Sequence, residues 1–248
     1  MANLDIFKNN KVLWMPAIAG ISLILASTIL AVALYSSRSS SDALSVTGSA
    51  SKEVVSDSAK FSGDFSRIVK ISKLKTGYEQ MAKDLALVKA FLKAQKIPDA
   101  NITISTVSMM ENYNYNNNNY QTEKEYTLSQ HVEVALPDVN KITALAQATT
   151  DLINKGVIFS TNPVEYYYTK LPELRVALLS DAIKDAMARA DKMAESTGKS
   201  VGSLKSAASG VVQVLPSNSL EISDYGTYDT SKINKNVMVT VRASFGLK

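Results

Sequence analysis

The sequence predicts an α+β fold with a mainly antiparallel sheet, two long helices and one short helix, preceded by an N-terminal transmembrane helix. Three observations lead to this prediction. Several segments alternate apolar and polar residues, two long segments repeat apolar residues every three or four positions, and residues 12–37 contain no charge. A period of two indicates half-buried strands, and a period near 3.6 indicates helices with one buried face. Strand pairs separated by helices favour hairpins and therefore antiparallel pairing.

The uncharged run is long enough to cross a membrane. Its apolar part, residues 12–35, would extend about 36 Å as a helix, against a hydrocarbon thickness of roughly 30 Å. Trp14 and Tyr35 stand where aromatic side chains gather at the two membrane interfaces. The run therefore predicts a membrane anchor.

Positive charge sets the predicted orientation of this anchor. Lys8 and Lys11 precede the run, and only Arg38 follows it closely. The positive-inside rule then places residues 1–11 in the cytoplasm and exports the rest of the chain. This arrangement is typical of a single-pass protein of the inner, cytoplasmic membrane whose C-terminal domain lies in the periplasm or outside the cell.

A cleaved signal peptide is the competing interpretation, because Ala31 and Ala33 form an A-x-A site close to the N-terminus. Cleavage there would give a soluble periplasmic protein. The apolar run exceeds the roughly 7 to 15 residues of a secretory signal, which favours a retained anchor. The expected organisation is a cytoplasmic N-terminus (1–11), an anchor (12–35), a polar tether (36–42) and an exported domain (43–248).

The elements of the exported domain follow from changes of period along the chain. Apolar residues recur at steps of three and four from Ile71 to Leu92, which predicts a long helix that Pro98 ends. Gly156 ends a short helix, and Pro172 occupies the first turn of a second long helix. In chain order the expected elements are strands 46–51 and 58–65, a helix over 71–97, strands 102–110 and 126–136, a short helix over 137–154, a strand over 157–169, a helix over 172–198, and strands 211–215 and 237–247.

The second long helix carries alanines along one face, including Ala186, Ala190 and Ala194. Small side chains let a helix lie close to a sheet, so we expect tight packing there. Residues 217–236 are expected to form a polar loop.

This chain resembles the SIMPL-domain family of bacterial envelope proteins over roughly residues 44 to 248. The resemblance rests on a set of segments in order along the chain: Val46-Thr47-Gly48, residues 91–98 followed by Asn101-Ile102-Thr103, residues 126–134, the charged Ala-rich helix 182–198 followed by Val201-Gly202, and the terminal strand 237–247. It implies an α+β periplasmic domain that often assembles into rings and is associated with envelope stress and cell-surface antigens. It supplies no catalytic residues. Members often carry a cleavable signal peptide, from which the long N-terminal run departs.

Composition argues against an enzyme. The chain has no Cys, which excludes thiolate metal sites and Cys nucleophiles, and a single His, which removes most acid-base and metal chemistry. A net charge of +4 over 248 residues does not indicate a nucleic-acid binder. We therefore expect no catalytic residues, no metal and no cofactor.

Tyrosines are the candidate contact residues. Tyr113, Tyr115 and Tyr120 flank a run of Asn at 116–119, and this composition suits contact with a second subunit or a sugar, or else a hairpin tip without such a role. Tyr166, Tyr167 and Tyr168 are consecutive in an expected strand, so their rings must point to both faces. We expect at least one of the three to need cover from outside a two-layer domain.

Two other groups of residues are expected to be ordinary surface. His131 lies on the polar side of its strand, with no second His to complete a metal site. The carboxylate pairs Asp181/Asp185 and Asp191/Glu195 share a helix face at i, i+4, but Lys and Arg are interleaved with them.

The function predicted from the sequence is that of a membrane-anchored, non-catalytic envelope protein, either a scaffold or a stress-related protein, whose exported domain forms a homo-oligomer, most plausibly a ring. Its expected partners are further copies of itself, the inner membrane and an envelope protein or glycan. The alternative is an envelope carbohydrate-processing hydrolase that uses paired carboxylates, because such an enzyme needs only two acids brought together by the fold.

Overall fold

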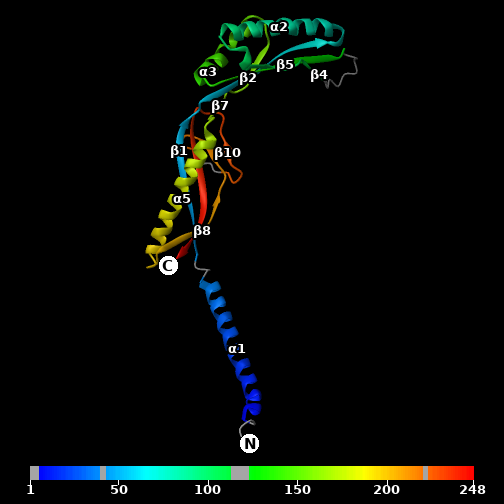
Figure 1. Cartoon of the computed structure of the whole chain (residues 1–248). Helices are drawn as coiled ribbons and strands as arrows, with labels where there is room; N and C mark the ends of the chain where they lie inside the picture. The colour runs from blue at the N-terminus through cyan, green and yellow to red at the C-terminus, as the bar shows by residue number, and fades with distance from the viewer. Residues whose placement is uncertain (1–5, 40–42, 113–122, 220–222) are drawn as a thin grey trace, which may run out of the picture. The chain divides into compact units, whose positions relative to one another are not determined.

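A computed structural model describes residues 6–39, 43–112, 123–219 and 223–248, and of residues 6–15, 17 and 35–39 it describes the backbone alone. Figure 1 shows the chain and its elements. In chain order these are α1 (Ile6–Ser39), β1 (Ala43–Val55), β2 (Ser58–Lys70), η1 (Ile71–Lys73), α2 (Leu74–Ala94), η2 (Asp99–Asn101), β3 (Ile102–Ile104), β4 (Ser108–Asn112), β5 (Glu125–Leu136), α3 (Val139–Ala148), α4 (Thr150–Asn154), β6 (Phe159–Thr161), β7 (Glu165–Tyr167), α5 (Leu171–Glu195), β8 (Val201–Ser209), β9 (Gln213–Pro216), β10 (Thr227–Tyr228) and β11 (Asn234–Leu247).

The expected N-terminal helix is present as α1, which is 34 residues long and extends to Ser39, into the expected tether. Over the residues that the structure describes, no helix combines the length and the hydropathy that a membrane span requires. The side chains of Trp14 and Tyr35, expected at the membrane interfaces, lie outside the described residues.

The chain divides into two compact units, and each is described by itself. Unit 1 comprises Met1–Ser49, Asp181–Gly210 and Thr240–Lys248, and unit 2 comprises Ala50–Ser180 and Val211–Val239. The division falls within β1, α5 and β11, each of which contributes residues to both units.

Unit 2 contains a sheet built on the long antiparallel pair β2 and β5. Its order within the described residues is β3-β5-β2-β6, with β4 also on β5 and β7 also on β2. Figure 1 shows α2 lying along this sheet. Odd-numbered residues of β2 and even-numbered residues of β5 face the helices. Phe61 and Val134, which lie opposite each other in the two strands, are both buried for this reason. The core on that face includes Phe65, Met81, Val88, Leu92, Leu128, Val132, Ile142 and Leu145.

The opposite face of this sheet is polar. Asp64 of β2 lies opposite His131 of β5, and their side chains are 3.0 Å apart and about half exposed, at 45% and 41%. His131 is therefore the exposed sheet residue that the alternation predicts. A sheet with helices on one face and polar residues on the other is a two-layer arrangement.

The rest of unit 2 packs around the first turns of α5. Leu174 and Leu178 form a buried cluster with Val214 of β9 and with Val237 and Val239 of β11. β9 pairs antiparallel with β11, whereas the two-residue β10 pairs parallel with β9. The prediction of mainly antiparallel sheet in an α+β fold is confirmed.

Unit 1 is a small helix-on-sheet layer in which α5 packs very closely. Ala186 and Ala190 of α5 form a cluster with Val46, Ala243 and Phe245. A Cβ added to Gly48 would lie 2.2 Å from the Ala182 carbonyl oxygen, so the helix backbone contacts the strand directly. The tight packing expected from the alanine face of this helix is confirmed.

Two expected strands are each divided in two. The segment 102–110 forms two strands, β3 and β4, because side-chain hydrogen bonds replace the regular ladder at Ser105, which lies between them. The Ser105 Oγ accepts the His131 backbone N–H, and the Ser105 carbonyl accepts the side-chain amide of Gln130. The segment 157–169 forms the short strands β6 and β7, separated by Pro163, which has no N–H for the ladder. The short helix 137–154 is likewise divided at Thr149.

One strand was not predicted at all. β8 pairs antiparallel with β11, but its residues alternate weakly and Ser203–Ser209 are exposed. Pairing with the strongly alternating β11 forms this strand, and the paired residues lie 32 or more positions apart in sequence. Two residues of the expected loop 217–236 also pair, as β10.

Candidate functional site

The three consecutive tyrosines all find partners inside the chain. Tyr166 is buried on the helix side of β7, with its hydroxyl 3.1 Å from Thr143 Oγ1. Tyr167, on the other face, donates its hydroxyl to Glu165, and its ring centroid is 6.0 Å from that of Tyr228. Tyr168 packs against the Leu174 cluster. All three rings therefore have partners within the chain, and their expected contact with a second subunit or a ligand stays a prediction. Tyr113, Tyr115 and Tyr120 lie outside the described residues.

A charged cluster lies beside Tyr167 on the polar face of the unit 2 sheet. Lys60 Nζ is 2.6 Å from Glu165 Oε2 and 3.7 Å from Glu133 Oε2. These three residues are neighbours because β2 pairs with β5 on one side and β7 on the other. The Lys60 hydrogen bond lowers the pKa of Glu165, against the effect of burial, and the Glu165 hydrogen bond raises the pKa of Lys60. Burial and then Glu165 raise the pKa of the Tyr167 hydroxyl.

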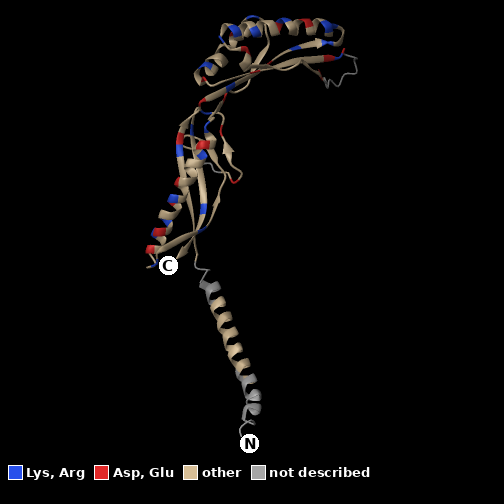
Figure 2. Cartoon of the chain, viewed as in Figure 1, with Lys and Arg blue, Asp and Glu red and all other residues tan. Residues whose placement is uncertain are grey.

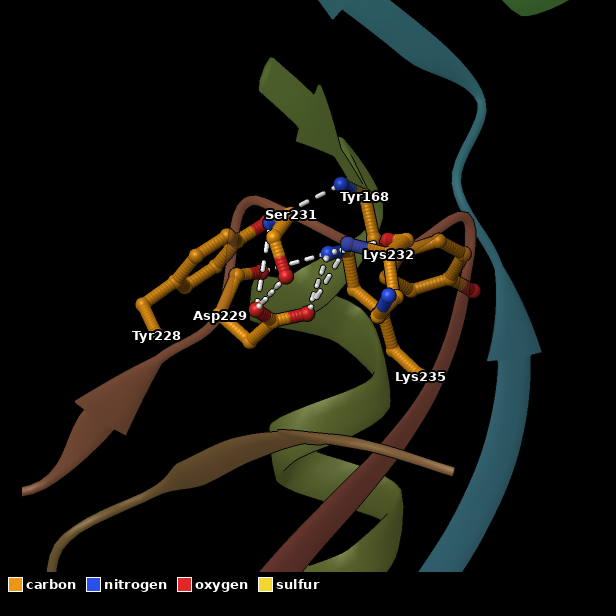
Figure 3. Close-up of polar contacts among 6 residues, drawn as sticks. All are labelled: Tyr168, Tyr228, Asp229, Ser231, Lys232 and Lys235. Carbon is orange, nitrogen blue, oxygen red and sulfur yellow. Dashed lines mark hydrogen bonds and ion pairs between the residues drawn. The ribbon is translucent and has the colours of Figure 1, made fainter. Parts of the chain in front are cut away.

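The second cluster surrounds a fully buried lysine at the start of β11, Lys235. Figure 3 shows Lys235 beside Asp229 and Tyr228. The Lys235 Nζ donates to the Lys232 carbonyl at 2.7 Å and to the Asp229 carbonyl. It also lies 3.6 Å from Asp229 Oδ2 and 5.8 Å from the centre of the Tyr228 ring. Burial lowers the pKa of Lys235, although Asp229 acts in the opposite direction.

Asp229 is the centre of this turn. Burial would raise the pKa of Asp229, but hydrogen bonds from Ser231 and Lys232, together with the charge of Lys235, lower it. The Tyr228 hydroxyl accepts the Tyr168 N–H at 2.9 Å, as Figure 3 shows. Lys235 has no exposed surface and its donors point at acceptors of the turn that precedes β11, so it fixes that turn and is not accessible to a substrate.

The charged groups of both clusters are engaged in contacts within the chain. A catalytic lysine or tyrosine would need an accessible atom beside a base, and a general acid would need a raised carboxyl pKa. Lys235 is inaccessible and Glu165 is held ionised. Among the described residues, no group of three or more His, Cys, Asp or Glu side chains could hold a metal ion.

Three of the four carboxylates singled out on the second long helix, Asp181, Asp185 and Glu195, form ion pairs with Lys or Arg of the same helix. Asp181 pairs with Lys184 at 3.0 Å, and Glu195 pairs with Lys192 at 2.9 Å. Asp185 accepts the Ser49 backbone N–H at 2.8 Å, and this bond, followed by the Arg189 bond, lowers its pKa. They are not arranged as acid-base pairs, and Asp185 instead caps the edge of β1.

Two grooves flank edge strands, one in each unit. The groove in unit 1 has a volume of about 670 Å³ and lies between β1 and α5; its lining consists of Ser45, Val46, Thr47, Ala188, Arg189, Lys192 and Met193. The groove in unit 2 has a volume of about 600 Å³ and lies between α2 and β3, with Lys89, Ala90, Lys93, Asp99, Ile102 and Ile104 around it. A pocket of about 390 Å³ lies next to the Lys235 turn, beside Lys232 and Ile233.

Sequence reasoning singled out the tyrosines but missed the charged cluster beside Tyr167 and the two grooves at the edge strands. Lys60, Glu133 and Glu165 alternate with apolar residues in their strands, which shows that they face away from the core, but nothing in their spacing shows that they meet. The grooves depend on which strands lie at the edges of the sheets. The alternation of apolar and polar residues within one strand does not show whether that strand lies at an edge.

An acid-side stability test addresses the Lys60–Glu165 pair. Since the pKa of Glu165 lies below its ordinary 4.5 in the folded chain, the pair stabilises the fold above that pH, and the stabilisation falls as pH drops through the folded pKa. We expect the melting temperature of Lys60→Met to fall less between about pH 5 and pH 3 than that of the unaltered chain.

The expected difference is about 1 kcal/mol or less, because both side chains are about a third exposed to solvent. The measurement is the melting temperature by circular dichroism at half-unit steps of pH. Lys83→Met, at an exposed lysine of α2, is the matched control and should parallel the unaltered chain. If the melting temperatures of Lys60→Met and the unaltered chain fell equally between pH 5 and pH 3, the Lys60–Glu165 pair would not contribute to stability as proposed.

Comparison with known proteins places the chain in a family without assigning a function. No curated protein matches it. The family model for SIMPL, described as a protein of unknown function (DUF541), matches residues 44–245, which include every described strand and helix from β2 to β10. Because this match covers most of the sequence, the chain belongs to the SIMPL family.

Proposed function

We propose that the chain is a membrane-anchored bacterial envelope protein whose SIMPL domain lies outside the cytoplasm, has no catalytic role and assembles with further copies of itself into a closed ring. The observation that carries this proposal is the part of the β11 sheet that lies in unit 1. Within the described residues, β1 and β8 each pair only with β11, so this sheet has an unpaired edge on each side. Exposed sheet edges bind further strands unless they are covered.

The β1 edge offers both backbone groups and a groove. The Ser49 N–H points away from β11, because Asp185 of α5 accepts it. Alternate residues of a strand direct their backbone groups to the same side, so Thr47 and Ser45 also face this edge. Both line the unit 1 groove together with apolar atoms of Met193. A strand from a second copy would find hydrogen-bonding groups and an apolar surface there.

The β8 edge is the matching surface. Gly210 donates its N–H to the Thr240 carbonyl of β11, so the odd-numbered residues Ala207 and Ser209 direct their backbone groups outward. Joining β8 of one copy to β1 of the next repeats one contact from copy to copy. Such a head-to-tail contact gives a ring when the rotation closes.

The N-terminal segment supports the anchor. Its nine large apolar side chains from Ile18 to Leu34 are 57–73% exposed, on all sides of α1, and nothing in the described chain covers them. The hydroxyls of Ser22 and Ser27 donate to carbonyls of the preceding turn, which satisfies them without water. Anchors held in one membrane would also raise the effective concentration of the domains.

The hydrolase alternative finds weaker support. The two carboxylates that meet in the fold are Glu133 and Glu165, which share Lys60. Because Lys60 lowers the pKa of Glu165, that carboxyl is a poor general acid, and a glycosidase of this type requires one.

One measurement tests anchor and assembly together: light scattering and intact mass of the detergent-solubilised full-length protein at micromolar concentration. We expect subunits of 26.8 kDa in a defined multimer. Thr47→Pro or Ala207→Pro removes one outward N–H and should reduce the particle to a monomer, with a small change in melting temperature because the internal ladder keeps its bonds.

The control is Met109→Pro at the edge of β4, in the other sheet, where the same type of change should leave the assembly intact. A monomeric unaltered protein would overturn the ring. A chain that begins near residue 34 would overturn the retained anchor and leave the soluble periplasmic alternative.

A further inference from the structure

The unit 2 groove, here called the α2–β3 groove, combines an apolar floor with positive charge. Ile102 and Ile104 of β3 form one wall and are half-buried against the core, while the exposed Ala90 belongs to α2. Lys89 and Lys93 stand one helical turn apart on α2 at the same groove. The volume of about 600 Å³ is large enough for several side chains.

The backbone of β3 faces this groove with hydrogen-bonding groups. Ser105 donates its N–H to the His131 carbonyl of β5, so Thr103, two residues before it, also faces β5. Ile102 and Ile104 therefore direct their backbone groups away from β5, to the outer edge. The Ile102 N–H is satisfied by the Asp99 carbonyl. The Ile104 N–H and the carbonyls of both isoleucines thus form a short open edge directly below the helix.

The charge at the groove is not neutralised within the described chain. Neither Lys89 nor Lys93 forms an ion pair there, and Asp99 is the one acidic side chain in the lining. Figure 2 shows several Lys and Arg positions, drawn in blue, along the helix that Figure 1 labels α2. An acidic ligand would gain the attraction of two lysines that have no other partner.

We propose that the α2–β3 groove binds an extended, acidic peptide segment of a partner protein, which adds to β3 as a further strand. The segment alternates apolar and acidic residues. Its backbone pairs with Ile102 and Ile104, its apolar side chains pack on Ala90 and the two isoleucines, and its carboxylates meet Lys89 and Lys93. Grooves between an edge strand and a helix bind extended peptides by this mode, in which backbone bonds give affinity and alternate side chains give specificity.

The experiment uses the full-length protein in detergent and a fluorescein-labelled peptide of seven alternating glutamates and valines, with polarisation as the readout at low ionic strength. We expect saturable binding that the double variant Lys89→Glu/Lys93→Glu weakens about tenfold or more. The matched control is Lys75→Glu/Lys83→Glu, which makes the same change of net charge at exposed positions of α2 outside the groove. It should change the affinity by less than about twofold.

A second pair of peptides separates strand addition from charge alone. The same peptide with alternate backbone nitrogens methylated keeps its charge but cannot pair with an edge, and it should bind about tenfold more weakly. Equal binding of the methylated peptide, or equal weakening by the two double variants, would overturn the proposal. Failure of the peptide to bind, together with Lys89- and Lys93-dependent binding of short-chain phosphatidylglycerol, would assign the groove to lipid headgroups and also overturn it. Melting temperatures confirm that each variant is folded.

Discussion

Replacing Gly48 by leucine should disrupt unit 1. A Cβ at this position would lie 2.2 Å from the Ala182 carbonyl oxygen and 2.4 Å from the Ala186 nitrogen, both of which belong to the backbone of α5. Backbone atoms cannot rotate aside as a side chain does, so the whole helix must move off the strand. Overpacking typically costs about 1–3 kcal/mol, and we expect a loss of about 3 kcal/mol or more here.

The measurement is the melting temperature of the full-length protein, with limited proteolysis to locate the disruption within residues 181–210. Gly202→Ala is the control in the same unit. Its Cβ would meet the Gly246 carbonyl at 3.0 Å, a contact that a small shift relieves, and we expect a loss of about 1 kcal/mol or less. A Gly48→Leu protein as stable as this control would mean that α5 does not pack on β1 at this distance.

Removing Arg67 should have a comparable effect in unit 2. Asp84 is 1% exposed, and Arg67 holds its carboxylate with two bonds, Nε to Oδ2 at 2.7 Å and Nη2 to Oδ1 at 2.9 Å. The Arg67 Nη2 also donates to the Gly156 carbonyl at 2.6 Å. The Asp84 hydrogen bond raises the pKa of the guanidinium, which remains charged. Arg67→Met leaves the buried Asp84 carboxylate with the Gln80 amide at 3.3 Å but without its cationic partner, and we expect a loss of about 3–5 kcal/mol.

The double variant Arg67→Met/Asp84→Leu tests the cause. Replacing both members of a buried ion pair with apolar residues is often neutral, so the double variant should recover most of the melting temperature. Urea unfolding followed by circular dichroism measures all three proteins. A double variant as unstable as Arg67→Met would show that packing around the arginine, not the unpaired charge, accounts for the loss.

The sequence by itself determined the helices and strands in which apolar residues repeat at regular intervals. The alternation of residues 126–136 and 237–247 predicts the long strands β5 and β11 with their buried faces, and the stripe through Met81, Val88 and Leu92 predicts α2. These features are local, because a side chain's direction in a strand or helix depends on its position within that element. The family resemblance follows from the same ordered segments and is confirmed.

Only the tertiary structure decided which of these faces and edges meet. It brings Lys60 to Glu165 across more than 100 residues, gives the three tyrosines partners within the chain, forms β8 against β11, and leaves β1, β3 and β8 at sheet edges. Strand order is set by how the elements pack over distance, and one periodic pattern is compatible with many orders. The candidate grooves lie at those edges, so they became visible only once the strands were paired.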